Sequence, residues 1–512
     1  MAIMVDPGTG GYGTPVPAKG MGESKAGAVD GSDSNPSPSW LATVRHLTGA
    51  DAASTERLDV AKFALIVLVC VGHFLEPFYK IGNRPTGVFL HAVFGFHVPA
   101  FVLISGYVSG DLNSNRRRAL VSGIVMPYLV LHLAYSLWYT KAFCPRRAGE
   151  VTQLLPKCEF VKNWSLIDPA VGRWDGWDDW TFAYPFAHLW YLVSLLTKRV
   201  WRPFALEMRW TILLHLVIGL LVGYTTVGRF LSLHRSAVHM PYFLTGYLMK
   251  KHGCFFPFAR SDGAKAIARS ALVVNIAGAF LATYRWKLKV EVWFQMDRYD
   301  TVYGELWKYG ALYQLGLYVW TFFTMAIAFA LVPEPQDVGV KYPEEGAYET
   351  LLPRTVGVDG AEAAAQKKAH VQRRAGRYGR EMDQDGASAR IYLRLAKWGS
   401  RTMYPFCLHI AIVMSLAQFT SWYDVTWTTD GDDIMLTTDG ASPAVTAKAL
   451  FTALMAFVFV IAMSLRPVTA MFKWVLEPDI SFLFTPEPQI RMKLGGTPEG
   501  GMKLGIRRPG YT

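Results

Sequence analysis

The chain alternates between long apolar runs and shorter stretches rich in charged residues, glycine and proline. A helix needs about 20 apolar residues to cross the hydrocarbon core of a bilayer. Ten runs approach this length, and we expect them to form transmembrane helices near residues 58–75, 88–108, 120–141, 183–200, 210–228, 237–250, 267–285, 310–332, 402–420 and 445–466. The pattern predicts an all-α fold, a polytopic membrane helix bundle of about ten transmembrane helices.

The regions outside these runs divide the chain further. Residues 1–54 and 486–512 are rich in small and polar residues, and we expect both to be disordered tails. The transmembrane domain then covers residues 55–485, with a long polar cytosolic insertion at 333–401 that is partly helical or disordered. We expect residues 467–485, which alternate apolar and charged groups, to lie along the membrane surface.

Composition agrees with the membrane assignment, because 51% of the residues are hydrophobic and 18% are charged. The net charge of +12 first suggests a nucleic-acid partner, but the basic residues gather at alternate ends of the apolar runs and accompany no nucleic-acid-binding motif. That arrangement follows the positive-inside rule. It predicts cytosolic N- and C-termini in an endomembrane or plasma membrane, with no nucleic-acid partner.

The loop at 142–182 then lies on the non-cytosolic side. It carries Asn163 in an Asn-Trp-Ser sequence, which is an N-glycosylation acceptor pattern. It also holds Cys144 and Cys158, which either form a disulfide there or remain free. The five cysteines form no metal-ligand cluster in the sequence, so we expect no metal site.

The first apolar run holds two costly side chains, Lys62 and His73. They are eleven positions apart, which places them on one helix face and separates them by about 16 Å along the axis. Glu76 follows one turn after His73 and is placed to orient its ring. Ionisable residues inside membranes are functional candidates because they are expensive to bury. In the alternative, Lys62 extends its ammonium to the surface and His73 is an interface residue.

Other runs also carry polar residues. The second run holds Ser105, His97 and Pro99, and we expect it to bend around the proline. His188, Arg235, His239 and His409 lie in later runs. One buried histidine is more often a packing residue than a catalyst, but several in different spans indicate a shared polar interior. Histidine is also a suitable general base near neutral pH.

Six short blocks, kept in order over residues 55–465, resemble the acyltransferase-3 family of integral membrane acyltransferases, and most closely its fucose 4-O-acetylase-like branch. The first is a basic residue, ten positions and a histidine, here Lys62 and His73. The others are HVPAFVLISGYVSG (97–110), RRRALVSGIVMPY (116–128), HLWYL (188–192), the stretch from Arg235 to Tyr247, and WGSRTMYPFCLH (398–409). Two features depart from the family: Lys62 stands where many members have arginine, and the tail and the insertion have no counterpart.

The resemblance implies transfer of an acyl group, often acetyl, from cytosolic acyl-CoA to a hydroxyl of a glycan or similar acceptor, with no permanently bound cofactor. His73 is the first choice for the general base, and Arg235, His188 or Ser105 for the donor to the charge that develops on the thioester oxygen. Lys62 and His409 complete the catalytic candidates. Phosphates of coenzyme A are expected at Arg116, Arg117, Arg118, Lys198 and Arg199, whose alternative role is to set topology alone.

Two other classes of function remain open from the sequence. Ten spans with interior His, Arg and Lys also suit a transporter or an acyl-group exporter, although no inverted repeat is evident. A non-catalytic membrane scaffold, with the insertion as its docking segment, is the third reading. A covalent product would indicate the acyltransferase, and transport without a covalent product would indicate the transporter. Dependence of function on the insertion would indicate the scaffold.

Overall fold

The computed structural model describes residues 55–110, 112, 114–142, 183, 185–228, 230–252, 262–295, 298–340, 386–420, 422–423, 428–430, 433–435 and 441–478. Helices form almost all of this part of the chain. The exception is a small antiparallel hairpin of β1 (Thr428–Asp430) and β2 (Asp433–Met435). The predicted all-α class is therefore confirmed.

The principal helices follow the predicted runs in order. They are α2 (Thr55–Lys80), α3 (Arg84–Phe94), α4 (His97–Tyr107), α5 (Ser114–Leu120), α6 (Met126–Ala142), α7 (Trp190–Glu207), α8 (Thr211–Leu221), α9 (Leu233–Lys251), α10 (Asp262–Tyr284), α11 (Tyr299–Tyr303), α12 (Gly310–Leu331), α15 (Ala387–Gly399), α16 (Met403–Phe419), α17 (Pro443–Met463) and α18 (Arg466–Leu476). A π-helix, η1 (Val121–Val125), joins α5 to α6, and 3₁₀ turns connect several others, among them η4 (Ala187–Leu189), η8 (Val290–Trp293) and η10 (Pro335–Val338).

Six helical segments among the described residues are long and apolar enough to cross a membrane: Thr55–Lys80, Arg84–Tyr107, Arg117–Trp138, Lys265–Tyr284, Tyr299–Leu331 and Pro443–Met463. The chain is thus an integral, multi-pass membrane protein. A helix occupies each of the ten predicted positions, but the count of ten spans is not confirmed. The apolar helices at 211–224 and 403–416 are shorter, and α7 and α9 carry several basic residues.

The second predicted span bends, but not around Pro99. The helix breaks earlier, between Phe94 and His97, so that α3 and α4 are separate helices. Pro99 lies in the first turn of α4, where a missing N–H breaks no intrahelical hydrogen bond. The break exposes the Gly95 carbonyl, and Thr321 of α12 donates its hydroxyl to that carbonyl at 2.7 Å.

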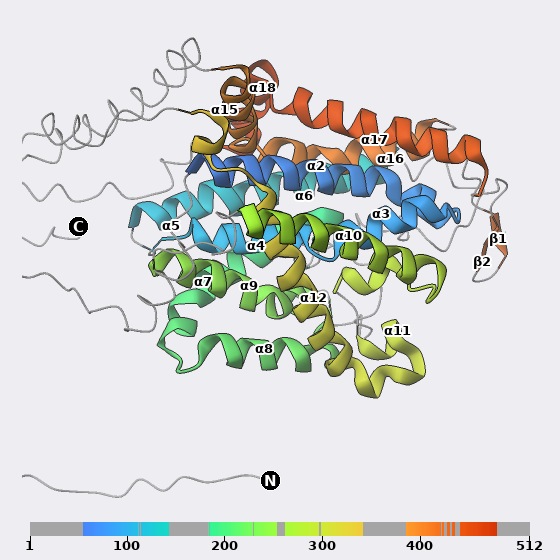
Figure 1. Ribbon diagram of the computed structural model, residues 1–512, viewed down its shortest axis with the longest axis horizontal. Helices are drawn as coiled ribbons and strands as arrows, with labels where there is room; N and C mark the ends of the chain where they lie inside the picture. The colour runs from blue at the N-terminus through green and yellow to red at the C-terminus, as the bar shows by residue number, and fades with distance from the viewer. Residues whose placement is uncertain are drawn as a thin grey trace, which may run out of the picture.

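The bundle is centred on α2, which runs along its long axis beside α17 and packs against α3, α4, α15, α16 and α17 (Figure 1). On the other side of α4, two glycines let α4 and α9 approach closely. A Cβ on Gly106 would overlap the backbone of Phe243, and one on Gly246 would overlap the backbone of Leu103. Small residues at helix crossings are the usual means of association in lipid, where apolar burial supplies no driving force between helices.

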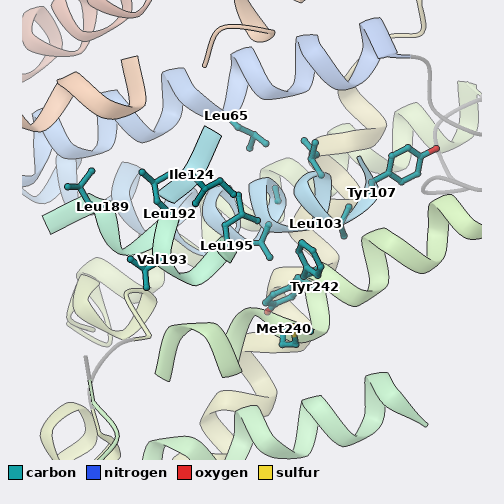
Figure 2. Close-up of a cluster of buried hydrophobic side chains, with 14 of the residues drawn as sticks. Leu65, Leu103, Tyr107, Ile124, Leu189, Leu192, Val193, Leu195, Met240 and Tyr242 are labelled. Carbon is teal, nitrogen blue, oxygen red and sulfur yellow. The ribbon is translucent and has the colours of Figure 1, made fainter. Parts of the chain in front are cut away.

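A single apolar core joins α7 and α9 to this centre. Figure 2 shows Leu65 of α2, Leu103 of α4, Leu192 and Leu195 of α7 and Tyr242 of α9 gathered in one cluster of buried side chains. Because these four helices contribute to it, the core fixes the positions of the polar residues that lie among them.

The two ends of the bundle differ. The hairpin of β1 and β2 lies at one end, and α5, α15 and α18 lie at the other (Figure 1). Within the predicted insertion at 333–401, η10 and α15 are described; α15 packs on the start of α2, where Gly399 meets the Asp59 backbone. The predicted surface segment begins with α18. The tails, Cys144, Cys158 and Asn163 lie outside the described residues.

Candidate active site

Three of the candidate histidines meet at the centre of the bundle. His73 of α2, His188 of η4 and His409 of α16 are far apart in the sequence, yet the His73 and His409 ring centroids are 5.1 Å apart and those of His188 and His409 are 4.8 Å apart. His188 and His409 are buried, whereas the His73 side chain keeps 25% of its surface exposed. We call these three residues the histidine cluster.

The hydrogen bonds of His409 define its tautomer. Its Nδ1 lies 2.8 Å from the Phe406 carbonyl and 3.1 Å from the Pro405 carbonyl. Carbonyls only accept, so Nδ1 carries the proton and Nε2 presents a lone pair. That Nε2 is buried and has no hydrogen-bond partner among the described residues. The cluster therefore contains an unclaimed acceptor in its interior.

Both ring nitrogens of His188 are also buried without a partner in the described part of the chain. The Cys407 carbonyl lies near this ring but outside hydrogen-bond geometry, and it accepts from the Tyr135 hydroxyl. Buried polar atoms nearly always find partners, so atoms left unsatisfied mark positions that a ligand or water completes. His188 and His409 together thus have three buried ring nitrogens to which a ligand or water could bind.

His73 belongs to a short polar relay along α2. Its Nδ1 lies 3.3 Å from Oε2 of Glu76, and Oε1 of the same carboxylate lies 3.1 Å from Nζ of Lys80. A carboxylate on Nδ1 holds that proton and leaves Nε2 free to accept another. This is the arrangement of a general base oriented by an acid, and it agrees with the predicted role of Glu76.

Aromatic rings border the cluster. Phe94 lies against His73 at 6.1 Å and against His97 at 5.0 Å between ring centroids. A Cβ at Gly72 would overlap the Phe94 ring, so this glycine is what lets the ring approach α2 beside His73. His97 itself donates from Nδ1 to the Val93 carbonyl at 2.9 Å, which is a packing role in α4. The apolar border limits access of water to His73.

Ser105 is placed beside the cluster rather than inside it. Its Oγ lies 3.0 Å from the hydroxyl of Tyr191, and the Tyr191 ring packs on Phe406 at 5.4 Å. Phe406 in turn packs edge-on against His188 at 5.2 Å. A line of rings therefore connects Ser105 with the histidines. Neither Tyr191 nor Phe406 was among the candidates from the sequence, because no local pattern marks an aromatic residue as part of a site.

A second polar region lies between α7 and α9. Lys198 is buried and its ammonium contacts the Ser194 hydroxyl, which lies 3.1 Å from the Ser236 hydroxyl; Ser236 donates to the Ser232 carbonyl at 2.7 Å. We call Ser194, Lys198 and Ser236 the serine–lysine cluster. Lys198 points into the bundle, so in this structure it does not meet the surface where a phosphate was expected.

Arg235 adjoins this second region through Trp190. Its guanidinium lies 4.1 Å from the Trp190 ring centroid, and its Nε donates to the Phe294 carbonyl at 3.1 Å. The Trp190 ring is also 5.9 Å from the His239 ring. Arg235 is therefore held by stacking and by a backbone carbonyl.

Lys62 and the other cations lie toward the end of the bundle that carries α15. Lys62 forms an ion pair with Asp59 at 2.6 Å, and its side chain is 25% exposed. Arg117 is exposed and Arg118 is half-buried, while the side chain of Arg116 lies outside the described residues. Arg199 lies close enough to Tyr191 to interact with it electrostatically. No group of His, Cys, Asp and Glu in the described residues has the geometry to hold a metal ion.

Comparison with known families gives one match. The model described as "Acyltransferase domain", that of the acyltransferase-3 family, matches residues 55–337, which is more than half of the chain. This range includes His73 and His188 and ends before α16, which brings His409. Comparisons with curated proteins and with solved structures find no match.

Proposed function

The chain belongs to the acyltransferase-3 family, and from this premise we propose that it is a membrane-bound O-acyltransferase of the fucose 4-O-acetylase-like branch. It transfers an acyl group, acetyl in our proposal, from acyl-CoA to a hydroxyl of a glycan or a similar acceptor. The observation that carries the proposal is the histidine cluster: an oriented and partly accessible His73 beside two buried rings with unclaimed nitrogens.

His73 is the proposed general base. A hydroxyl is a weak nucleophile until its proton is removed. His73 Nε2 takes that proton while the oxygen attacks the thioester carbonyl of the donor, and the carbon–sulfur bond breaks as the ester forms. The leaving thiolate of coenzyme A then receives the proton from the His73 imidazolium. Glu76 stabilises this imidazolium through Nδ1, at 3.3 Å.

The developing charge on the thioester oxygen needs a hydrogen-bond donor. We propose His188 for this role, because its ring nitrogens are unclaimed and it lies beside His409. Ser105 is the next candidate, through the hydroxyl pair that it makes with Tyr191. Arg235 is less well placed, since its guanidinium is already stacked on Trp190.

The donor is proposed to enter from the cytosolic side, where Arg116, Arg117, Arg118 and Arg199 supply charge for the phosphates of coenzyme A. Lys62 stands between that side and His73 on the same helix. Its ion pair with Asp59 favours an electrostatic role over proton transfer. We infer this direction of entry, and cytosolic N- and C-termini, from the distribution of basic residues along the chain.

The test is an assay with purified protein reconstituted in lipid vesicles. Acetyl-CoA labelled in the acetyl group is supplied outside, and a panel of mono- and oligosaccharides is supplied inside or outside in separate samples. The proposal expects a labelled, covalently acylated saccharide that base hydrolysis releases as acetate. Label that crosses the membrane with no covalent product would overturn it in favour of a transporter, and no label in either form would also contradict it.

A further inference from the structure

The last helix, α18, has three distinct sides. Phe472, Val475 and Leu476 pack into the apolar core. Met471 and Trp474 are 59% and 75% exposed, and at about 100° per residue they lie on a second side together with Pro467. A third side, next to the exposed apolar one, carries Arg466 and Lys473. Packed, apolar and cationic sides around one short helix are typical of a helix that lies in the membrane interface.

The start of this helix lies in a group of cations. Lys397 in the last turn of α15, Arg401 in the following turn and Arg466 interact electrostatically. Partial burial, together with the charges of Arg466 and Arg401, lowers the pKa of Lys397, and partial burial with Arg466 lowers the pKa of Arg401. No ion pair to a carboxylate is present for these three cations in the described part of the chain. The group therefore has an excess of positive charge that an anion would stabilise.

The three cations are held by the fold. Arg401 donates to the Ser464 carbonyl at 2.7 Å, which links it to the end of α17. Lys397 precedes Trp398, whose ring centroid lies 5.5 Å from that of Phe63 on α2, and Gly399 packs on the Asp59 backbone. Their convergence is a feature of the packed bundle, since α15, the turn after it and α18 are all anchored.

We propose that Lys397, Arg401 and Arg466 form a binding site for the phosphate of an anionic phospholipid, whose acyl chains lie along Met471 and Trp474. Both chemical halves of the ligand have a counterpart: cations for the headgroup and exposed apolar side chains beside them for the chains. A free nucleotide phosphate would use only the first. Anionic headgroups attract basic residues that lie near the membrane surface.

The experiment measures binding of short-chain lipids to the purified full-length chain. Dioctanoyl phosphatidylglycerol is titrated into protein in a non-ionic detergent, with dioctanoyl phosphatidylcholine as the neutral lipid, and the midpoint of thermal unfolding is followed. We expect phosphatidylglycerol alone to raise the midpoint, because a ligand that binds only the folded state stabilises it. The double variant Lys397→Ala/Arg466→Ala should bind it about 10- to 30-fold more weakly. Arg401 is left intact because it also caps α17.

The matched control is Lys250→Ala/Lys251→Ala, which removes the same charge from the exposed end of α9. It should bind phosphatidylglycerol as the unmodified protein does. Equal loss in both double variants, or no response to phosphatidylglycerol, would overturn the site. Competition by coenzyme A for the same cations would also overturn it, since the cluster would then hold a donor phosphate. None of these readouts depends on acyltransferase activity, so the site stands or falls separately from the proposed function.

Discussion

The two polar regions of the bundle use their hydrogen bonds in opposite ways. In the serine–lysine cluster, Lys198 donates to the Ser194 hydroxyl, which pairs with the Ser236 hydroxyl, and Ser236 also contacts the Ser232 carbonyl. We call this a closed chain, because none of its buried side-chain polar atoms lacks a partner among the described residues. In the histidine cluster, nitrogens of His188 and His409 have no partner among the described residues. Each buried side-chain polar atom of the first region has at least one partner among the described residues, whereas three buried ring nitrogens of the second have none.

This difference distinguishes intramembrane polar residues that have a structural role from those that can take part in chemistry. All such residues are costly, so cost alone marks each of them as a functional candidate. A closed hydrogen-bond chain compensates the cost within the protein, whereas an open one leaves it to be met by substrate or water. The histidine cluster also has an accessible member, His73, while every member of the serine–lysine cluster is buried.

The largest effect should come from removing the proposed base. His73→Ala removes the nitrogen that accepts the acceptor's proton, and general-base catalysis contributes about 10²- to 10⁴-fold. We expect the rate of acyl transfer to fall about a thousandfold, measured as labelled product per folded protein, with a monodisperse peak in size-exclusion chromatography as the check on folding.

The control for this variant comes from the other region. His239→Ala removes a buried histidine beside Trp190 and Tyr242 and should leave the rate within about tenfold of the original, through a loss of stability alone. If the two variants lose activity equally, the distinction between the regions is wrong. Normal activity of His73→Ala would remove His73 as the base.

A smaller effect is expected from Glu76→Gln. The amide still fits beside His73 but no longer stabilises its imidazolium, and the ion pair with Lys80 is lost. We expect kcat to fall about 10- to 100-fold. The loss should appear in kcat rather than in KM for acyl-CoA, because the lost charge stabilises the imidazolium that forms during the reaction. A merely structural role for Glu76 would lower the yield of folded protein without lowering kcat per folded protein.

Glu334→Gln is the matched change elsewhere. Glu334 pairs with Arg57 in a partly buried ion pair between η10 and α2, so its loss should lower the midpoint of thermal unfolding while kcat per folded protein stays unchanged. An equal fall of kcat in this variant would show that the rate reports folding rather than the base.

Much of this comparison was accessible from the sequence. The eleven-residue spacing of Lys62 and His73 and the position of Glu76 are properties of one helix, so local periodicity predicts them. The meeting of His73 with His409 joins residues that are 336 positions apart, and only the packing of α16 on α2 shows it. The bend lies before Pro99 rather than at it, because a proline in the first turn of a helix breaks no intrahelical hydrogen bond. The carbonyl at the break accepts from a hydroxyl of α12, a contact that the local sequence does not reveal.

The sequence alone does not determine the role of Lys198. A lysine near the end of an apolar run is equally suited to a phosphate, a topology signal or an internal hydrogen bond. The structure shows it pointing inward onto Ser194. Burial of a whole side chain depends on which face of α7 meets α9, and that face follows from contacts across the bundle rather than from the residues around Lys198.

The smallest effect is therefore expected for Lys198→Met, which replaces a buried ammonium by an apolar chain of similar length. Substitution of buried charged groups by apolar ones is often neutral or stabilising, so activity should stay within about threefold and the unfolding midpoint should be equal or higher. Lys62→Met is the matched change in the lysine of α2, where loss of the ion pair with Asp59 should lower the midpoint instead. A rise of more than about tenfold in KM for acyl-CoA in Lys198→Met alone would contradict the closed-chain interpretation, because each tenfold change reflects about 1.4 kcal/mol of binding free energy. The serine–lysine cluster would then open to the donor, as its sequence first suggested.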